Sequence, residues 1–199
     1  SLLLQVSPAT LIPRPDTELL VEQALEKIPA DADWQIADLG TGSGAIALAI
    51  ASERPNCHVV ATDISTAALA VAQTNAQRLN INNVEFRQGS WHEALKDGEQ
   101  FQLIASNPPY IDANDKHLQH DGLPHEPLNA LTPGTDGLNA IRIIAAQMKS
   151  HLCTPNWLLL DHGYDQGPQA REILSQQGYT GITTHTDLGG NERMTQAKR

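Results

Sequence analysis

Short apolar stretches alternate with amphipathic ones along most of this chain, and this alternation restricts the fold more than any other feature. The apolar stretches predict strands over residues 34–39, 58–62, 84–88, 101–106, 157–160, 182–186 and 193–196. The amphipathic stretches predict helices over residues 16–28, 45–52, 66–79 and 166–177, and one more between residues 136 and 148. Strands separated by helices form parallel sheets through right-handed crossovers. The sequence therefore predicts an α/β fold, with a doubly wound, mostly parallel seven-stranded sheet covered by helices on both faces.

Polar residues mark the expected starts of three of these helices. Asp16, Ser65 and Asp136 stand where an amphipathic stretch begins, and their side-chain oxygens can accept hydrogen bonds from free N–H groups of the first turn. Residues 111–135 show no helical or strand periodicity. Because so long a connection is uncommon in a compact domain, we expect this stretch to be a functional loop or lid.

The composition narrows the class of protein. A chain of 199 residues with 40% hydrophobic and 18% charged residues is typical of a globular domain. Its net charge of −10 argues against broad contact with phosphate backbones, so we expect no direct nucleic-acid partner. No apolar run approaches the roughly 20 residues that cross a bilayer, and the first residues lack the pattern of a signal peptide. We therefore expect a cytoplasmic protein that does not bind membranes.

Three features fall at the predicted carboxyl ends of strands: the glycine-rich residues 40–44, Asp63 and Asn107. Ligands of open α/β sheets bind beyond these ends, close to the point where the strand order reverses. The positions of these residues alone therefore predict a ligand site at this edge of the sheet.

The segment 38–44, Asp-Leu-Gly-Thr-Gly-Ser-Gly, joins the first predicted strand to the next helix. Glycine permits a tight turn and a close approach of a ligand to the backbone, and the helix start offers free N–H groups. With the following alanine the segment also fits the dinucleotide pattern Gly-x-Gly-x-x-Gly/Ala. On its own it is therefore compatible with NAD, FAD or S-adenosylmethionine.

Two further residues have both a nucleotide-binding and a structural interpretation. Asp63 ends the second strand, where a carboxylate can accept hydrogen bonds from both hydroxyls of a ribose. Its other possible role is to cap the following helix, although Ser65 can already do so. Trp91 follows the third strand, where its ring could flank an adenine, and a plain core Trp is an equally good interpretation.

Asn107, Pro108, Pro109 and Tyr110 follow the fourth predicted strand, where the two prolines force the chain out of the sheet. This turn can grip a planar nitrogen, because the amide and proline oxygens accept its hydrogens and the ring packs on its face. The simpler interpretation is a rigid strand-ending turn.

Together, the glycine-rich segment and this turn favour methyl transfer to a planar nitrogen over hydride transfer. An amide nitrogen is a poor nucleophile because its lone pair is delocalised. Acceptors for both of its hydrogens fix its plane for in-line attack on a sulfonium methyl group. Such orientation can lower the activation barrier by up to about 7–11 kcal/mol. A strong base is then not required, and no His, Asp or Glu directly adjoins the turn.

In its combined motifs the chain resembles the catalytic domain of the bacterial peptide-chain release factor N5-glutamine methyltransferases. The resemblance is carried, in this order, by residues 11–18 (Leu-Ile-Pro-Arg-Pro-Asp-Thr-Glu), 38–48, 106–111 (Ser-Asn-Pro-Pro-Tyr-Ile) and 187–193 (Asp-Leu-Gly-Gly-Asn-Glu-Arg). The Arg-Pro-Asp-Thr-Glu string favours the glutamine-modifying branch. The resemblance implies a class I, Rossmann-like methyltransferase fold with an antiparallel last strand and S-adenosylmethionine as methyl donor. It also implies the Gly-Gly-Gln glutamine of release factors as acceptor.

The resemblance also implies roles for individual residues. The cofactor would be held by Gly40, Thr41, Gly42, Ser43 and Gly44 at its methionine part, Asp63 at the ribose, Trp91 near the adenine, and Asn107. The side-chain oxygen of Asn107 and the carbonyl of Pro108 would accept the two amide hydrogens, and Tyr110 would pack on the amide plane. Pro109, Arg14 and Glu18 complete the implied substrate-binding set.

The chain departs from the family pattern in a few places. Family members usually carry an N-terminal helical domain that helps grip the release factor. Residues 1–30, an extended leading segment and a helix, could represent only its trailing edge, and residues 31–199 the methyltransferase domain. We therefore expect the helical domain to be absent. Ser90 stands where an acidic residue is common, and Asp161 stands where glutamate is usual.

Other functions fit parts of the same pattern. A ribosomal-protein glutamine methyltransferase would share the amide chemistry. Nucleic-acid methyltransferases of adenine N6 or guanine N2 also act on a planar nitrogen, and would need base flipping on duplexes. A nucleotide-binding module without turnover and a dehydrogenase are two further alternatives. The His, Cys, Asp and Glu residues show no metal-ligand spacing, so we expect no metal.

Overall fold

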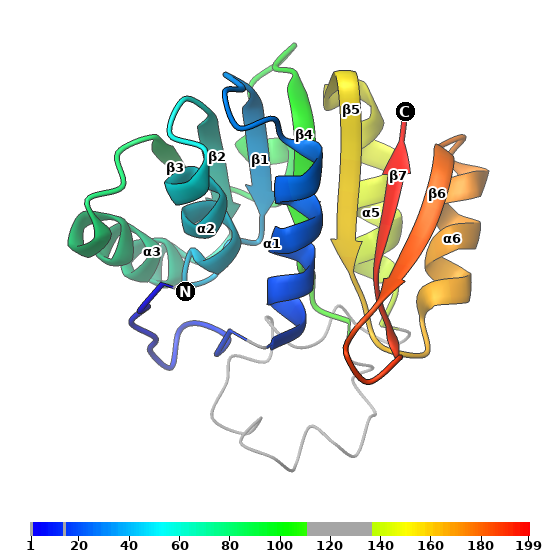
Figure 1. Ribbon diagram of the computed structural model, residues 1–199, viewed down its shortest axis with the longest axis horizontal. Helices are drawn as coiled ribbons and strands as arrows, with labels where there is room; N and C mark the ends of the chain where they lie inside the picture. Colours follow the sequence, from blue (N-terminus) through cyan, green and yellow to red (C-terminus); the bar gives the residue numbers. More distant parts are fainter. Residues whose placement is uncertain (1, 14, 111–136) are drawn as a thin grey trace.

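The computed structural model describes residues 2–13, 15–110 and 137–199 (Figure 1). The strands are β1 (Gln35–Leu39), β2 (His58–Asp63), β3 (Val84–Gln88), β4 (Phe101–Ser106), β5 (Leu152–Asp161), β6 (Thr180–Thr186) and β7 (Glu192–Lys198). The helices are α1 (Pro15–Lys27), α2 (Ala45–Glu53), α3 (Thr66–Leu79), α5 (Asn139–Met148) and α6 (Gly167–Gln176), with short 3-10 turns η1 (Trp91–Ala94) and η4 (Lys149–His151). The expected loop or lid at residues 111–135 lies outside the described residues.

The strands of the described residues form one sheet in the order β3-β2-β1-β4-β5-β7-β6. Neighbouring strands from β3 to β5 are parallel, whereas β7 runs antiparallel to both β5 and β6. The predicted doubly wound sheet with an antiparallel last strand is therefore confirmed. Because the chain builds outward from β1 in one direction and then returns to place β4 on its other side, the strand order reverses between β1 and β4.

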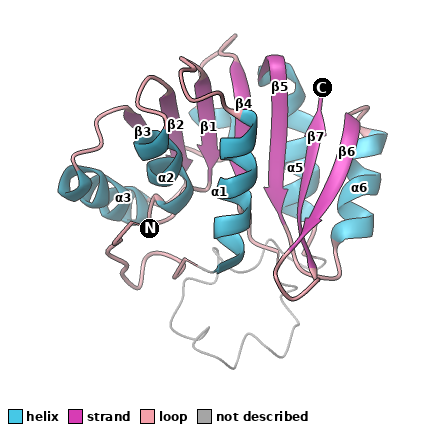
Figure 2. Ribbon diagram, in the orientation of Figure 1, coloured by secondary structure: helices cyan, strands magenta, loops and turns pink. Residues whose placement is uncertain are grey.

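Helices cover both faces of the sheet (Figure 2). Alternate residues of each strand point to opposite faces, so Ile36 and Leu103 pack in one core with α1 and α2. Their neighbours Ala37 and Ile104 pack in a second core with α5 and α6. The two cores hold β1 and β4 rigidly at the centre of the molecule, where their carboxyl ends form the base of the site.

Of the three predicted helix caps, one is correct. The Ser65 hydroxyl accepts a hydrogen bond from the Ala68 N–H at 3.2 Å. By contrast, α1 begins at Pro15, so Asp16 lies within the first turn; proline suits this position because no partner is needed for its nitrogen. Helix α5 begins at Asn139 with Leu138 in the cap position, and Asp136 lies outside the described residues.

Strand lengths differ most from expectation in β5. It begins at Leu152 rather than at residue 157, because Leu152 already pairs with Phe101 of β4, and residues 153–156 lie in the register shift before Trp157 pairs with Leu103. Residues 153–156 show no apolar alternation, so sequence periodicity could not reveal this extension. Among the described residues, no helix has the length and hydropathy that a membrane span requires.

Candidate functional site

The glycine loop, residues 40–44, leaves β1 and leads into α2. Gly42 has a φ of +57° and no atom within 4 Å of the place where a Cβ would stand, so its backbone is open to a ligand. Gly44 has a different role. A Cβ there would lie 3.0 Å from Leu48 and 3.2 Å from Ala72, so this glycine permits the close packing of α2 against α3.

Asp38, the fourth residue of β1, is fully buried beneath the glycine loop. Its Oδ2 accepts hydrogen bonds from the Thr41 hydroxyl at 2.6 Å and from the Ala47 N–H at 3.1 Å. Its Oδ1 has no hydrogen-bond partner among the described residues. Burial raises the pKa of this carboxyl to about 7 against the two hydrogen bonds that lower it. The sequence analysis named Asp38 only as part of a motif, whereas in the structure its side chain braces the glycine loop.

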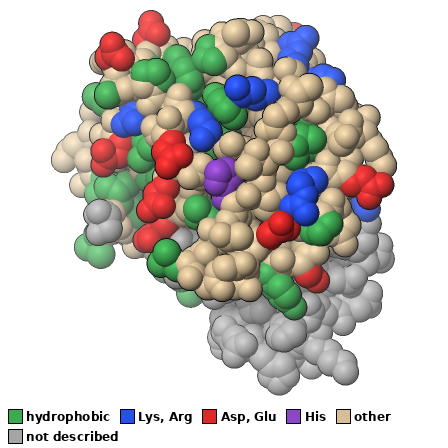
Figure 3. Space-filling view, turned by 45° about the vertical axis from the view of Figure 1, so that its right-hand side comes forward, with side chains coloured by type: hydrophobic (Ala, Val, Ile, Leu, Met, Phe, Trp, Pro, Cys, Tyr) green, Lys and Arg blue, Asp and Glu red, His purple; other side chains and the backbone are tan. Residues whose placement is uncertain are grey.

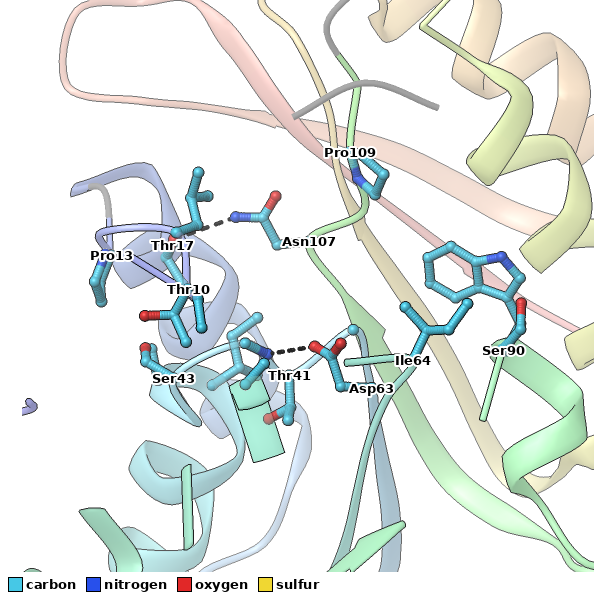
Figure 4. A pocket seen from close by; sticks show the side chains of 18 of the residues that line it. Thr10, Pro13, Thr17, Thr41, Ser43, Asp63, Ile64, Ser90, Asn107 and Pro109 are labelled. Carbon is cyan, nitrogen blue, oxygen red and sulfur yellow. Dashed lines mark hydrogen bonds between the residues drawn. The ribbon is translucent and has the colours of Figure 1, made fainter. Parts of the chain in front are cut away.

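Asp63, at the end of β2, ties the glycine loop to the next strand. One carboxylate oxygen accepts from the Gly42 N–H at 2.9 Å (Figure 4), and the other accepts from the Ser65 N–H at 2.9 Å. Asp63 therefore stabilises the turn before α3, whose cap is Ser65, and it also lines the cavity, while its contact with a ribose stays a prediction. Each oxygen retains a lone pair with which it could accept from a ligand hydroxyl.

Trp91 and Ile64 form apolar walls beside the glycine loop. The Trp91 ring lies 3.7 Å from the place of a Cβ on Gly40, and its backbone adopts a φ of +46°, which is uncommon for a bulky residue. It also packs against the core of the α5 face. Ile64, directly after Asp63, is 63% exposed and lines the cavity, a position that the sequence analysis did not single out.

The Asn-Pro-Pro-Tyr turn, residues 107–110, leaves β4 directly beside the glycine loop, because Ser106 pairs with Leu39 in neighbouring strands. The Ser106 hydroxyl donates to the Leu39 carbonyl at 2.7 Å. Beyond it, the Asn107 side-chain nitrogen donates to the Thr17 hydroxyl at 3.4 Å (Figure 4). At the other end of the turn, the Gln166 side chain donates to the Tyr110 carbonyl at 2.9 Å. Thr17 and Gln166 thus hold the two ends of this turn, and Ser106 fixes the strand end that precedes it.

A cavity of about 280 Å³ lies between the glycine loop, the Asn-Pro-Pro-Tyr turn and the segment before α1. The sequence-predicted residues that line it are Gly40, Thr41, Gly42, Ser43, Asp63, Trp91, Asn107 and Pro109. Those outside its lining are Gly44, Pro108, Tyr110 and Glu18. Arg14 lies outside the described residues. The sequence analysis missed Thr10, Leu11, Pro13, Thr17 and Ile64, which also line the cavity.

His162, which follows β5, is buried and fully hydrogen-bonded. Its Nδ1 lies 2.9 Å from the Gly163 carbonyl and its Nε2 lies 2.9 Å from the Thr195 hydroxyl. Since a carbonyl only accepts, Nδ1 carries the proton and Nε2 accepts from the threonine. Burial lowers the pKa of this imidazole, which favours the neutral form. Within the described part of the chain, no group of three or more His, Cys, Asp and Glu side chains could hold a metal ion.

This combination of fold and site defines a methyltransferase of class I: a doubly wound sheet with an antiparallel β7, a glycine loop after β1 and an acidic residue after β2. The family model of the methyltransferase domain matches residues 30–195.

Comparison with curated relatives identifies the family within this class. The release factor glutamine methyltransferase of Pseudomonas aeruginosa is 55% identical over 195 residues, which cover 98% of this chain and 70% of the relative. That of Xylella fastidiosa strain Temecula1 is 53% identical over 190 residues, covering 96% and 69%. The chain belongs to the release factor glutamine methyltransferase family.

Solved structures agree with this placement. A release-factor-specific protein-(glutamine-N5) methyltransferase from Alicyclobacillus acidocaldarius superposes with a TM-score of 0.58 at 27% identity, over 98% of both chains. A Thermus thermophilus 16S rRNA N2 G1207 methyltransferase, solved with AdoMet and guanosine, shares the fold with a TM-score of 0.68 at 19% identity. The match covers 94% of this chain and 44% of that one.

Proposed function

We propose that this chain transfers a methyl group from S-adenosylmethionine to the side-chain amide nitrogen of the Gly-Gly-Gln glutamine in peptide-chain release factors. One observation carries the proposal: the carboxyl ends of β1 and β4 are neighbours, so Asn107 lies beside the glycine loop across a single cavity. A donor held by the loop and an amide held by Asn107 would then meet. The family membership selects glutamine as the acceptor. This substrate class places the reaction in the cytoplasm.

The residues present fit the proposed cofactor. Gly42 leaves its backbone open to the cavity, where a Cβ would project into the ligand space. Asp63 provides a carboxylate for the ribose hydroxyls, while Ile64 and Trp91 provide apolar surface for the adenine ring. When bound, the cofactor would supply a methyl group carried on a positively charged sulfur. After the transfer the sulfur is a neutral thioether.

The Asn-Pro-Pro-Tyr turn provides what an amide acceptor needs. Asn107 Oδ1 accepts one N–H of the glutamine amide and the Pro108 carbonyl accepts the other, which fixes the amide plane. Tyr110 packs on that plane. The nitrogen that gains the methyl group loses one proton, and solvent is the acceptor. Orientation rather than a strong base then carries the reaction, in agreement with the absence of His, Asp and Glu from the turn and from the residues that directly adjoin it.

We also propose that residues 31–199 form the methyltransferase domain and that residues 1–30 lead into it. The segment before α1 lines the cavity at Thr10, Leu11 and Pro13, so it belongs to the site as well as to the approach to the helix. Arg14 and Glu18 would support the substrate from this side.

The charge distribution favours a protein substrate over a nucleic acid. The chain carries a net charge of −10. On the face that Figure 3 shows, lysine and arginine side chains are scattered among acidic and apolar ones and form no continuous patch. A nucleic-acid methyltransferase needs a basic surface along the phosphate backbone. A ribosomal-protein glutamine would suit the same clamp and is the closest competitor.

The test is mass spectrometry of a purified release factor after incubation with the full chain and S-adenosylmethionine. The proposal predicts one added methyl group on the Gly-Gly-Gln glutamine, and none when that glutamine is replaced by glutamate. If ribosomal protein gains the methyl group and the release factor does not, the substrate assignment is wrong. If S-adenosylhomocysteine does not bind in calorimetry, the assignment of the cofactor site is wrong.

A further inference from the structure

Thr17 occupies an unusual place on α1. The buried face of this helix is formed by Leu20 and Ala24, and Ile28 continues it directly after the last turn; the three recur at helical spacing and belong to the core beside the sheet. Thr17 precedes Leu20 by three residues and continues the same stripe, and it is only 8% exposed. A residue at the end of an apolar stripe is usually apolar, so a hydroxyl here calls for a partner.

That partner is the side chain of Asn107. Its Nδ2 donates to the Thr17 Oγ1 at 3.4 Å, although the two residues are 90 positions apart in the sequence. Figure 4 shows the Asn107 nitrogen directed at Thr17 and the oxygen on the other side of the amide. Both residues line the cavity.

With Nδ2 bound to Thr17, Asn107 offers its Oδ1 to a substrate. The two ends of an asparagine amide have nearly the same shape, but one end donates and the other accepts. A glutamine amide nitrogen brings donors, so it needs the oxygen. If the Asn107 amide turned over, its own N–H groups would face those of the substrate and the clamp would fail.

Helix α1 is held firmly enough for Thr17 to anchor the Asn107 side chain. Arg54, which follows α2, donates from Nε to the Ile28 carbonyl at 2.9 Å and from a terminal nitrogen to the Leu25 carbonyl at 2.8 Å. These bonds satisfy carbonyls at the end of α1 and fix the helix against its neighbour. The opposite end of the helix therefore presents Thr17 at a defined place in the cavity wall.

We propose that Thr17 is a positioning residue that anchors the Asn107 side chain through Nδ2, so that Oδ1 faces the amide of the acceptor. This inference rests on the proposed function and extends it to a residue that acts through Asn107. Thr17 is not a proton acceptor in the transfer, and it does not replace any group of the clamp.

The test compares Thr17→Val, which removes the hydroxyl but keeps the shape, with Thr17→Ser, which keeps the hydroxyl. Thr17→Val should lower kcat for glutamine methylation by about five- to tenfold, with little change in S-adenosylhomocysteine affinity, and Thr17→Ser should stay within about twofold of the parent chain. In the Asn107→Ala background, Thr17→Val should cause no further loss, because the group it acts through is gone. Equal losses in both backgrounds, or an unchanged rate in Thr17→Val, would overturn the inference.

A second readout does not depend on activity. The side-chain amide protons of Asn107 can be assigned in ¹⁵N spectra by their disappearance in Asn107→Ala. In Thr17→Val the proton directed at Thr17 should shift upfield and exchange faster with water, and in Thr17→Ser it should remain as in the parent chain. Unchanged amide signals in Thr17→Val would contradict the inference, whereas a parent chain that methylates no glutamine would contradict only the proposed function.

Discussion

The glycine loop and the Asn-Pro-Pro-Tyr turn face the same cavity but are held by different kinds of contact. The loop is braced by Asp38, Asp63 and Asn75, whose side-chain hydrogen bonds to the loop and the start of α2 join residues 3, 9, 21 and 32 positions apart. The turn is braced by Thr17 and Gln166, which are 90 and 56 positions away from the residues they hold. The glycine loop, which we call the local wall, is therefore held by one continuous stretch of the chain, residues 38–75. The Asn-Pro-Pro-Tyr turn, the other wall, is held by residues from distant parts of the sequence.

This difference separates two tasks. A cofactor site needs open backbone and a carboxylate near a helix start, which a strand–loop–helix unit supplies by itself. A clamp for an amide needs acceptors at fixed positions and directions, which neighbouring elements must impose. Changes in the local wall should mainly affect cofactor binding, and changes in the other wall should mainly affect turnover.

The largest effect is expected from Asn107→Ala. Losing the acceptor that fixes the glutamine amide should lower kcat by about 10²- to 10³-fold, by analogy with the loss of a single oxyanion-hole donor. Steady-state methylation of a release factor measures it, with Asn82→Ala on an exposed turn as the matched control. Methylation at the parental rate would show that the turn is only structural.

A smaller effect, on cofactor affinity at the glycine loop, is expected from Asp63→Asn. The charged acceptor is lost while one oxygen remains for the turn before α3, so S-adenosylhomocysteine should bind about tenfold to a hundredfold more weakly. Calorimetry measures the affinity, and Asp97→Asn, an exposed residue, is the control. An unchanged affinity would confine Asp63 to its structural hydrogen bonds.

Gln166→Leu tests the far end of the Asn-Pro-Pro-Tyr turn. The Tyr110 carbonyl loses its donor and the Gly163 N–H loses its acceptor, so we expect about a tenfold lower kcat with cofactor affinity maintained. Gln176→Leu on the exposed side of α6 is the control. If cofactor affinity falls by the same factor as kcat, Gln166 supports the whole cavity. The assignment of turnover to the Asn-Pro-Pro-Tyr turn and of cofactor binding to the glycine loop would then be wrong.

The last prediction concerns stability rather than catalysis. The folded chain keeps a proton on Asp38 up to about pH 7, whereas the unfolded chain releases it near the ordinary value of 3.8. Folding therefore takes up a proton between these values, and the contribution of Asp38 to the free energy of unfolding falls as the pH rises through this window. Urea unfolding should show Asp38→Asn gaining stability relative to the parent chain from pH 4 to pH 7. A constant difference would mean that the pKa of Asp38 is not raised.

Much of the local wall could be predicted from the sequence. Glycines, a strand before them and an apolar helix after them are adjacent in the chain, and the cavity lining includes Gly40, Gly42 and Asp63 as expected. The exception is Gly44, which packs against Ala72 instead of facing the cavity, a contact that depends on how α2 and α3 come together.

The other wall could be predicted only in part. The chemistry of Asn107 follows from its residue type, but its partners do not, because nothing local to it indicates Thr17 or Gln166. A signal for Thr17 was nonetheless present: it continues the apolar stripe of residues 20, 24 and 28 with a hydroxyl. For Gln166, a polar residue directly before an amphipathic helix gives no comparable signal. The helix starts at Pro15 and Asn139 were missed because polar neighbours also resemble caps.

The most direct test of the two-wall account is calorimetric titration of S-adenosylhomocysteine into Asn107→Ala and Asp63→Asn, side by side with the parent chain. The account predicts an affinity close to the parental value for Asn107→Ala and a clearly weaker one for Asp63→Asn. Equal losses in both variants would contradict it, because the cofactor would then depend on the Asn-Pro-Pro-Tyr turn as much as on the glycine loop.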